Sequence, residues 1–167
     1  MTEDAARPGR VRRNADGFEG RLERRLSHPP AAVWSMLIEP QGIAQWLAPG
    51  TIELRKGGRV HVDFGDSGVV IDSTVTDLDP PRLIAYSWSS GAEPVRPLRW
   101  ELSAEGAGTR LVLTVRLPAG EDIAKACAGF DAHLEMLAAA LEGVPIRFPF
   151  ELYLAARRGY QETLAGQ

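Results

Sequence analysis

The sequence predicts an α+β fold in which a curved antiparallel sheet of about seven strands packs against a long C-terminal helix. Between Gly120 and Gly143, apolar residues recur at three- and four-residue steps, which is typical of a long helix that buries one face. Before that helix, short segments alternate apolar and polar residues and end at Gly, Pro or Asp, as strands joined by tight turns do. Two proline-flanked apolar segments predict two short helices between the first and second strands.

The first half of the chain can be divided in order. Residues 1–16 are polar, rich in Arg and without periodicity, so we expect a flexible leader followed by one domain over 17–167. Residues 18–26 alternate apolar side chains with charged ones, which predicts a strand with one solvated face. The prolines at positions 29, 30 and 40 delimit a helix over 31–38 and a second short helical segment over 43–47.

Six further strands are expected before the long helix, each bounded by turn residues. They are predicted at residues 52–54, 60–64, 69–78, 83–88, 98–102 and 111–115. After the long helix, the Gly143-Val144-Pro145 break precedes a helical piece over about 150–164. We interpret this C-terminal extension, from about residue 146, as a continuation or kinked extension of the long helix.

Composition excludes several classes of protein. A net charge of -3 and a pI near 5.7 provide no field that would attract nucleic acid or an anionic membrane. No segment approaches the roughly 20 apolar residues of a membrane span, and no secretory signal is recognisable. The single cysteine, Cys127, lies at a core-facing helical position, so we expect a reduced thiol and a cytoplasmic protein. Seventeen arginines against two lysines indicate a GC-rich bacterial genome.

Five segments occur in a characteristic order: PPAAVWSMLIEPQGIAQWLAP, KGGRVHVDF, VTDLDPPRLIAYSW, LRWELSAEGAGTRLVLTV and GFDAHLEMLAAALEG. From Phe18 to about Gly143 the chain therefore resembles the Hsp90 ATPase activator homologue 1-like family of the START/Bet v 1 superfamily, also called SRPBCC or polyketide cyclase-like. The resemblance implies a helix-grip fold with a hydrophobic cavity between sheet and C-terminal helix. Lipid carriers, receptors, cyclases, hydrolases and co-chaperone domains share this fold, so the fold alone selects no function.

Candidate ligand-binding residues are those expected to face the space between sheet and helix. Aromatic side chains offer apolar bodies and, in Trp and Tyr, a polar handle, although any of them can equally fill the core. His133 lies at the edge of the apolar stripe of the helix, whereas His61, Arg96 and Arg99 are expected to face outward. The candidates are Trp46, Phe64, Tyr86, Trp88, Trp100, Phe130, His133, Leu134 and Leu137.

These patterns favour binding of a small hydrophobic or amphipathic ligand, without metal or cofactor. The sequence has neither metal-ligand spacings nor G-x-S-x-G nor a phosphate-binding glycine motif, and no catalytic residue is nominated. One alternative is a cyclase or hydrolase in which His133, Tyr86 or a pocket carboxylate performs acid–base chemistry on a polyketide-like substrate. Another is a module that binds a regulator or a chaperone, although the co-chaperone that names the family has an additional N-terminal domain. A homodimer that forms through the outer face of the sheet or through the C-terminal extension is a further possibility that the sequence leaves undecided.

Overall fold

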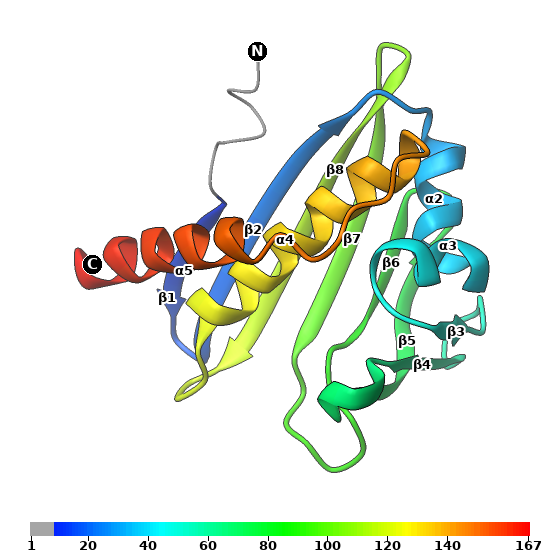
Figure 1. Ribbon diagram of the computed structural model, residues 1–167. Coiled ribbons are helices and arrows are strands. Elements are labelled where there is room, and N and C mark those ends of the chain that lie inside the picture. Colours follow the sequence, from blue (N-terminus) through cyan, green and yellow to red (C-terminus); the bar gives the residue numbers. More distant parts are fainter. Residues whose placement is uncertain (1–8) are drawn as a thin grey trace.

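The computed structural model describes residues 9–167, and its strands form one antiparallel sheet (Figure 1). The strand order is β1-β2-β8-β7-β6-β5-β4-β3, so the first strands pair with the last. A register shift between Val75 and Asp77 interrupts the β5–β6 pairing. The strands are β1 Arg10–Asn14, β2 Gly17–Leu26, β3 Gly50–Ile52, β4 Arg59–Asp63, β5 Val70–Asp79, β6 Leu83–Ser87, β7 Pro97–Glu105 and β8 Gly108–Pro118.

The helices complete the predicted architecture. Helices α2 (Pro30–Ile38) and α3 (Pro40–Trp46) connect β2 to β3, α4 (Ile123–Leu141) lies across the sheet, and α5 (Phe150–Ala165) follows. A proline starts each of the two short helices, at a position where the missing N–H costs no intrahelical bond. Asp122 caps α4 by accepting a hydrogen bond from the backbone N–H of Lys125 at 3.0 Å. The predicted α+β helix-grip class is confirmed.

The hydrophobic core lies between α4 and the face of the sheet that it covers. Successive side chains of a strand point to opposite faces of the sheet, so every second residue of the central strands contacts the apolar face of α4. The most deeply buried include Leu22, Leu98, Trp100, Leu113, Cys127, Leu134 and Leu137. On the opposite face, β2 and β8 exchange ion pairs between Glu23 and Arg110 at 2.6 Å and between Glu19 and Arg116 at 3.0 Å. The first predicted strand therefore has the charged outer face expected of it.

Residues 10–14 differ from the expected flexible leader, because they form β1. This strand pairs with β2 from Arg10 opposite Arg21 to Asn14 opposite Gly17. The side chain of Asn14 accepts a hydrogen bond from the backbone N–H of Asp16 at 3.0 Å and so stabilises the connecting turn. Val11 is the apolar residue that β1 buries. The rest of the expected leader, residues 1–8, lies outside the described residues.

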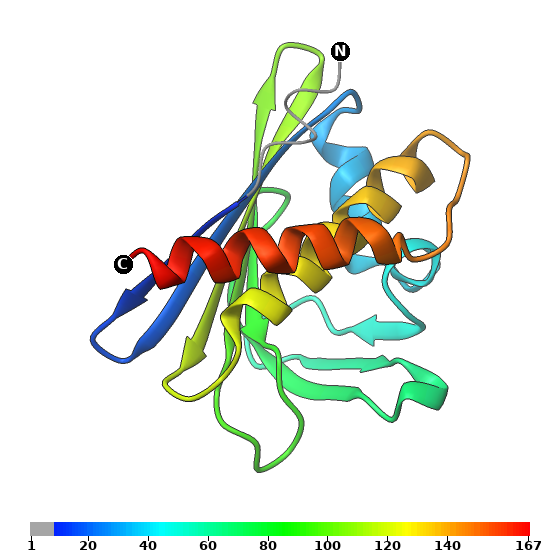
Figure 2. The ribbon, with the colours of Figure 1, turned by 60° about the vertical axis from the view of Figure 1, so that its left-hand side comes forward.

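Helix α5 is not the continuation or kinked extension of α4 that we expected. The chain reverses after Gly143, whose φ of +75° favours glycine, and α5 then runs back across α4 to reach β1 (Figure 2). The C-terminal Gln167 side chain donates to the carbonyl of Val11 at 2.9 Å. The two ends of the described chain therefore meet at the β1 edge of the sheet.

A buried polar cluster holds α5 in place. Arg24 of β2 pairs with Asp131 of α4, with 2.7 Å between Nη2 and Oδ1, and Tyr160 of α5 donates to the other carboxylate oxygen. The Tyr160 hydroxyl in turn accepts from the backbone N–H of Gly9 at 3.0 Å. We call these four residues the Asp131 cluster. It joins four separate parts of the chain, two of them directly to the Asp131 carboxylate and Gly9 through the Tyr160 hydroxyl.

Candidate functional site

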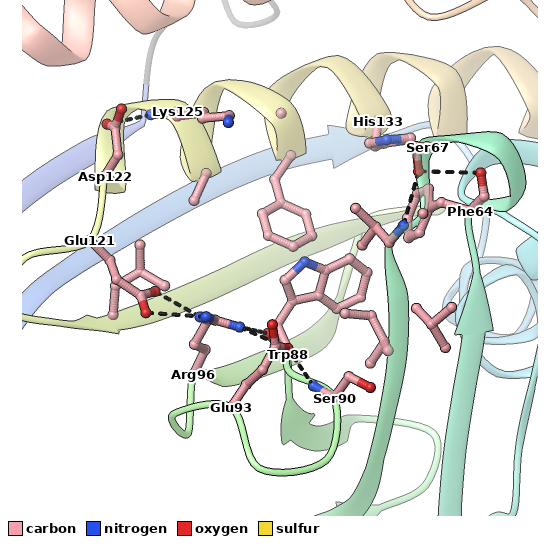
Figure 3. Close-up of a pocket in the computed structure, with 18 of the residues that line it drawn as sticks. Phe64, Ser67, Trp88, Ser90, Glu93, Arg96, Glu121, Asp122, Lys125 and His133 are labelled. Carbon is pink, nitrogen blue, oxygen red and sulfur yellow. Dashed lines mark hydrogen bonds and ion pairs between the residues drawn. The ribbon is translucent and has the colours of Figure 1, made fainter.

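An open cavity of about 1170 Å³ lies beside the N-terminal half of α4 (Figure 3). Its walls come from the turn between β4 and β5, which contains the 3₁₀ segment η1 (Gly65–Ser67), and from the loop between β6 and β7. The segment joining α4 to α5 and the first turns of α5 complete the rim. The volume exceeds the roughly 300–1,000 Å³ of most small-molecule sites, so a bulky organic ligand fits.

Three aromatic rings from three elements form the apolar wall. Phe64 follows β4, Trp88 follows β6, and Phe130 lies on α4. Trp88 contacts Phe64 with ring centroids 5.9 Å apart and Phe130 with centroids 5.2 Å apart, both in edge-to-face geometry. Such pairs contribute roughly 0.5–1.5 kcal/mol beyond burial of their area, which holds the wall in one arrangement.

His133 adds a hydrogen-bond acceptor to this wall. Its Nδ1 lies 2.9 Å from the carbonyl oxygen of Trp46, and because a carbonyl only accepts, Nδ1 carries the proton. Desolvation lowers the pKa of His133, partly opposed by that hydrogen bond, so the ring is neutral near pH 7. In the neutral ring Nε2 then accepts. The ring is packed against Phe64 and Phe148, with centroids 5.9 and 5.3 Å away.

A charged cluster closes the end of the cavity near the β6–β7 loop. Arg96 binds Glu121 through two hydrogen bonds, Nε to Oε1 at 2.7 Å and Nη2 to Oε2 at 3.1 Å. Its Nη1 also donates to the carbonyl of Trp88 at 3.3 Å and lies 3.4 Å from Glu93. The hydrogen bonds to Glu121 raise the pKa of Arg96 above its usual value. This cluster ties the β6–β7 loop to the residues just before α4.

The mouth of the cavity is apolar and comes from the C-terminal extension. Phe148 and Phe150 are 39% and 59% exposed, unusually high for phenylalanine, and both contact Tyr153 with centroids 5.8 and 5.9 Å apart. Arg157 of α5 reaches back to Asp122 at the start of α4, with 3.2 Å between Nη2 and Oδ2. The extension therefore forms part of the site.

The nine residues proposed from the sequence divide into two groups. Phe64, Trp88, Phe130 and His133 line the cavity. The other five do not line it but are buried in the core at or below 3% exposure: Trp46, Tyr86, Trp100, Leu134 and Leu137.

Hydrogen bonds show that the buried aromatic residues belong to the core. The indole N–H of Trp46 donates to the carbonyl of Met36 at 2.8 Å, and that of Trp100 donates to the hydroxyl of Tyr86 at 3.2 Å. Burial raises the pKa of Tyr86 to about 12, partly offset by the hydrogen bond from Trp100. Both indole N–H groups therefore have acceptors within the protein, and the hydroxyl of Tyr86 is engaged by Trp100 in the core.

Sequence reasoning missed the polar and C-terminal parts of the site. Arg96 was expected to face outward, yet its side chain is only 20% exposed because Glu121, 25 positions away, pairs with it. The pairing is a tertiary contact with no local signal. Phe148 and Phe150 did leave a signal, since the segment after Gly143 is rich in apolar residues although Pro145 and Pro149 prevent a regular helix there.

Two features are absent from residues 9–167. No group of three or more His, Cys, Asp or Glu side chains in this part of the chain is arranged to hold a metal ion. Among the same residues, no helix is both long enough and apolar enough to cross a membrane.

Comparisons with known proteins agree with the fold. Residues 27–142 match the family described as Activator of Hsp90 ATPase homolog 1-like protein. No protein of curated function matches the chain.

Solved structures cover most of the chain. CalU16 from Micromonospora echinospora is 20% identical with a TM-score of 0.79, over 93% of this chain and 96% of CalU16. The protein encoded by gene BPP1335 of Bordetella parapertussis is 29% identical with a TM-score of 0.68, over 92% and 88%. The Aha1 dimer from Colwellia psychrerythraea is 18% identical with a TM-score of 0.61, over 74% and 96%. At 18–20% identity the likeness shows the fold alone.

Proposed function

This chain belongs to the Activator of Hsp90 ATPase homolog 1-like family, and from that premise we propose that it binds a small hydrophobic or amphipathic molecule between its sheet and α4. The observation that carries the proposal is the open cavity of about 1170 Å³ with an aromatic wall and a charged cluster at one end. Family membership supports it at the level of the fold, which serves ligand binding and cyclase-type chemistry alike.

The expected affinity follows from the apolar area that a ligand can bury. A polycyclic aromatic probe that buries about 300 Å² gains about 7.5 kcal/mol at roughly 25 cal/mol per Å². Loss of translational and rotational freedom reduces that gain, so a dissociation constant between about 10 µM and 1 mM is expected. Pyrenebutanol is a suitable neutral probe, because its emission reports transfer from water to an apolar site.

Two glycines provide a matched test. Gly129 lies on α4 in the cavity wall, and a Cβ added there meets no atom within 4 Å. Gly159 of α5 has equally open space but does not line the cavity. Gly129→Leu should therefore place a side chain in the cavity and reduce the space for a ligand, whereas Gly159→Leu should leave the cavity unchanged.

In a titration with pyrenebutanol, the wild-type protein and Gly159→Leu should bind alike. Gly129→Leu should bind at least about tenfold more weakly, a loss of about 1.4 kcal/mol or more. Circular dichroism of all three proteins controls for folding. Equal binding by the three would place the probe elsewhere and refute the proposal, as would absence of binding by the wild type.

Catalysis of the cyclase or hydrolase type is a second candidate, favoured by the neutral His133 ring in the cavity wall. An acceptor nitrogen beside a bound substrate is the arrangement that a general base requires. His133→Phe would then abolish turnover of a polyketide-like substrate and leave pyrenebutanol bound. Retained turnover in this variant would remove His133 as the base.

We also propose a reducing, cytoplasmic compartment, which the buried free thiol of Cys127 supports. A homodimer is a further proposal, supported by the dimeric Aha1 structure from Colwellia psychrerythraea. Light scattering at several protein concentrations tests it: a constant monomer mass would refute it.

A further inference from the structure

The charges around the cavity indicate which polar group its ligand carries. Three carboxylates line the cavity: Glu93, Glu121 and Asp122. Arg96 pairs with the first two at 3.4 and 2.7 Å, and Arg157 pairs with Asp122 at 3.2 Å. Each acidic side chain of the wall therefore has an arginine within 4 Å, although Arg96 is shared by two of them.

Lys125 is the cation that has no such match. It lies on α4 and lines the cavity, with an exposed side chain (Figure 3). Within residues 9–167 its ammonium group makes no ion pair or hydrogen bond, and only its backbone N–H is engaged, by Asp122. Lys56, the other lysine of the chain, instead lies 3.8 Å from Asp77 and outside the cavity.

Trp88 supplies a second unused donor. Its backbone carbonyl accepts from Arg96, but its indole N–H donates to no group in the described part of the chain. The indole N–H groups of Trp46 and Trp100, in contrast, both have protein acceptors. Figure 3 shows the indole nitrogen of Trp88 on the side of the ring that faces α4. An indole N–H at an apolar wall is a handle for an acceptor on a ligand.

We propose that the cavity selects ligands that combine an aromatic body with a carboxylate or a similar anionic group. The anionic group pairs with Lys125, the indole N–H of Trp88 provides a second donor, and the aromatic body packs against Phe64 and Phe130. This inference rests on the proposed function. Because Lys125 is exposed, its contribution is that of a surface ion pair, about a two- to fivefold change in affinity.

A matched pair of probes separates the charge from the aromatic body. Pyrenebutyrate and pyrenebutanol share the ring system and the alkyl chain and differ in the anionic group. Each probe is titrated into the wild-type protein, Lys125→Met and Lys56→Met. Lys125→Met should lower the affinity for pyrenebutyrate about two- to fivefold and leave the affinity for pyrenebutanol unchanged. In about 1 M salt the wild-type protein and Lys125→Met should bind pyrenebutyrate with the same affinity. Lys56→Met should bind both probes as the wild type does.

The outcomes distinguish this inference from the proposed function. If pyrenebutanol binds but Lys125→Met leaves pyrenebutyrate affinity unchanged, the anionic preference is refuted and the cavity remains a ligand site. An equal loss of affinity for both probes in Lys125→Met also refutes the anionic preference, because it shows that the substitution altered the shape of the cavity wall. If the wild type binds neither probe, both proposals fail together.

Discussion

Asp131→Asn tests whether the Asp131 cluster is a desolvated ion pair on which the position of α5 depends. The side chains of Arg24 and Asp131 are 10% and 4% exposed, and their 2.7 Å contact joins β2 to α4. Tyr160 of α5 donates to the second carboxylate oxygen. The substitution keeps the shape of the side chain and removes its charge, so Arg24 is left buried without a counterion.

The magnitude follows from this burial. Removing one partner of a buried ion pair costs about 3–5 kcal/mol, because the remaining charge stays desolvated. Asparagine retains one acceptor oxygen, so we expect the lower end, about 3 kcal/mol. Among residues 9–167, the only other acceptor for the Arg24 guanidinium is the carbonyl of Glu23, 3.0 Å from Nη1, and its Nε has no hydrogen-bond partner.

Urea denaturation followed by circular dichroism measures the loss in free energy of unfolding. Glu105→Gln is the control, because Glu105 pairs with Arg25 at 3.0 Å but both side chains are about half exposed. We expect at most about 1 kcal/mol for this surface change. A loss in Asp131→Asn no larger than that of the control would refute the reasoning, since it would mean that Arg24 reaches water.

The Asp131 cluster should also affect how stability depends on pH. Burial raises the pKa of Asp131, and the nearby Arg24 charge opposes the shift. Arg24→Met removes that opposition, so the folded state holds the proton to higher pH than the unfolded state does. The free energy of unfolding of Arg24→Met should therefore fall as pH rises above about 4, more steeply than in the wild type. If the free energy of unfolding depends on pH in the same way in both proteins, this prediction is wrong.

Three further predictions concern the core. Gly20→Ala should lose about 1–3 kcal/mol of stability, because its methyl group would lie 2.2 Å from Sγ of Cys127; unchanged urea denaturation would refute this. Burial raises the pKa of the Cys127 thiol, so Ellman's reagent should label it in urea and not in the folded protein. Because the pKa of Tyr86 rises from 10.0 to about 12, stability should fall as pH rises through that interval. The loss of stability between these pH values should be smaller in Tyr86→Phe. If stability depends on pH equally in both proteins, ionisation of Tyr86 is not its cause.

Most of the fold was predictable because its signals are local. The stripe of apolar residues in α4 and the alternation in β2, β7 and β8 each report one buried face. Strand β1 was missed because its four exposed residues, three of them arginines, hide the one apolar residue that it buries. The reversal of α5 depends on tertiary contacts of Tyr160, which no local pattern encodes.

The candidate site was only partly predictable, because residue type does not separate a cavity wall from a core. Trp46 and Trp88 are the same amino acid, yet the first is 1% exposed and the second lines the cavity. What distinguishes them is a hydrogen bond from Trp46 to Met36, ten residues earlier in the chain. The ion pair between Arg96 and Glu121 is likewise a tertiary contact, so the sequence alone does not predict it.

The C-terminal part of the cavity rim lies beyond the residues that the family model matches. Phe148, Phe150 and Tyr153 follow residue 142, where the family match ends, whereas the Asp131 carboxylate that anchors their helix lies within it. Chimaeras that graft a relative's tail after residue 142, with Tyr160 retained as the docking point, should inherit the donor's ligand preference.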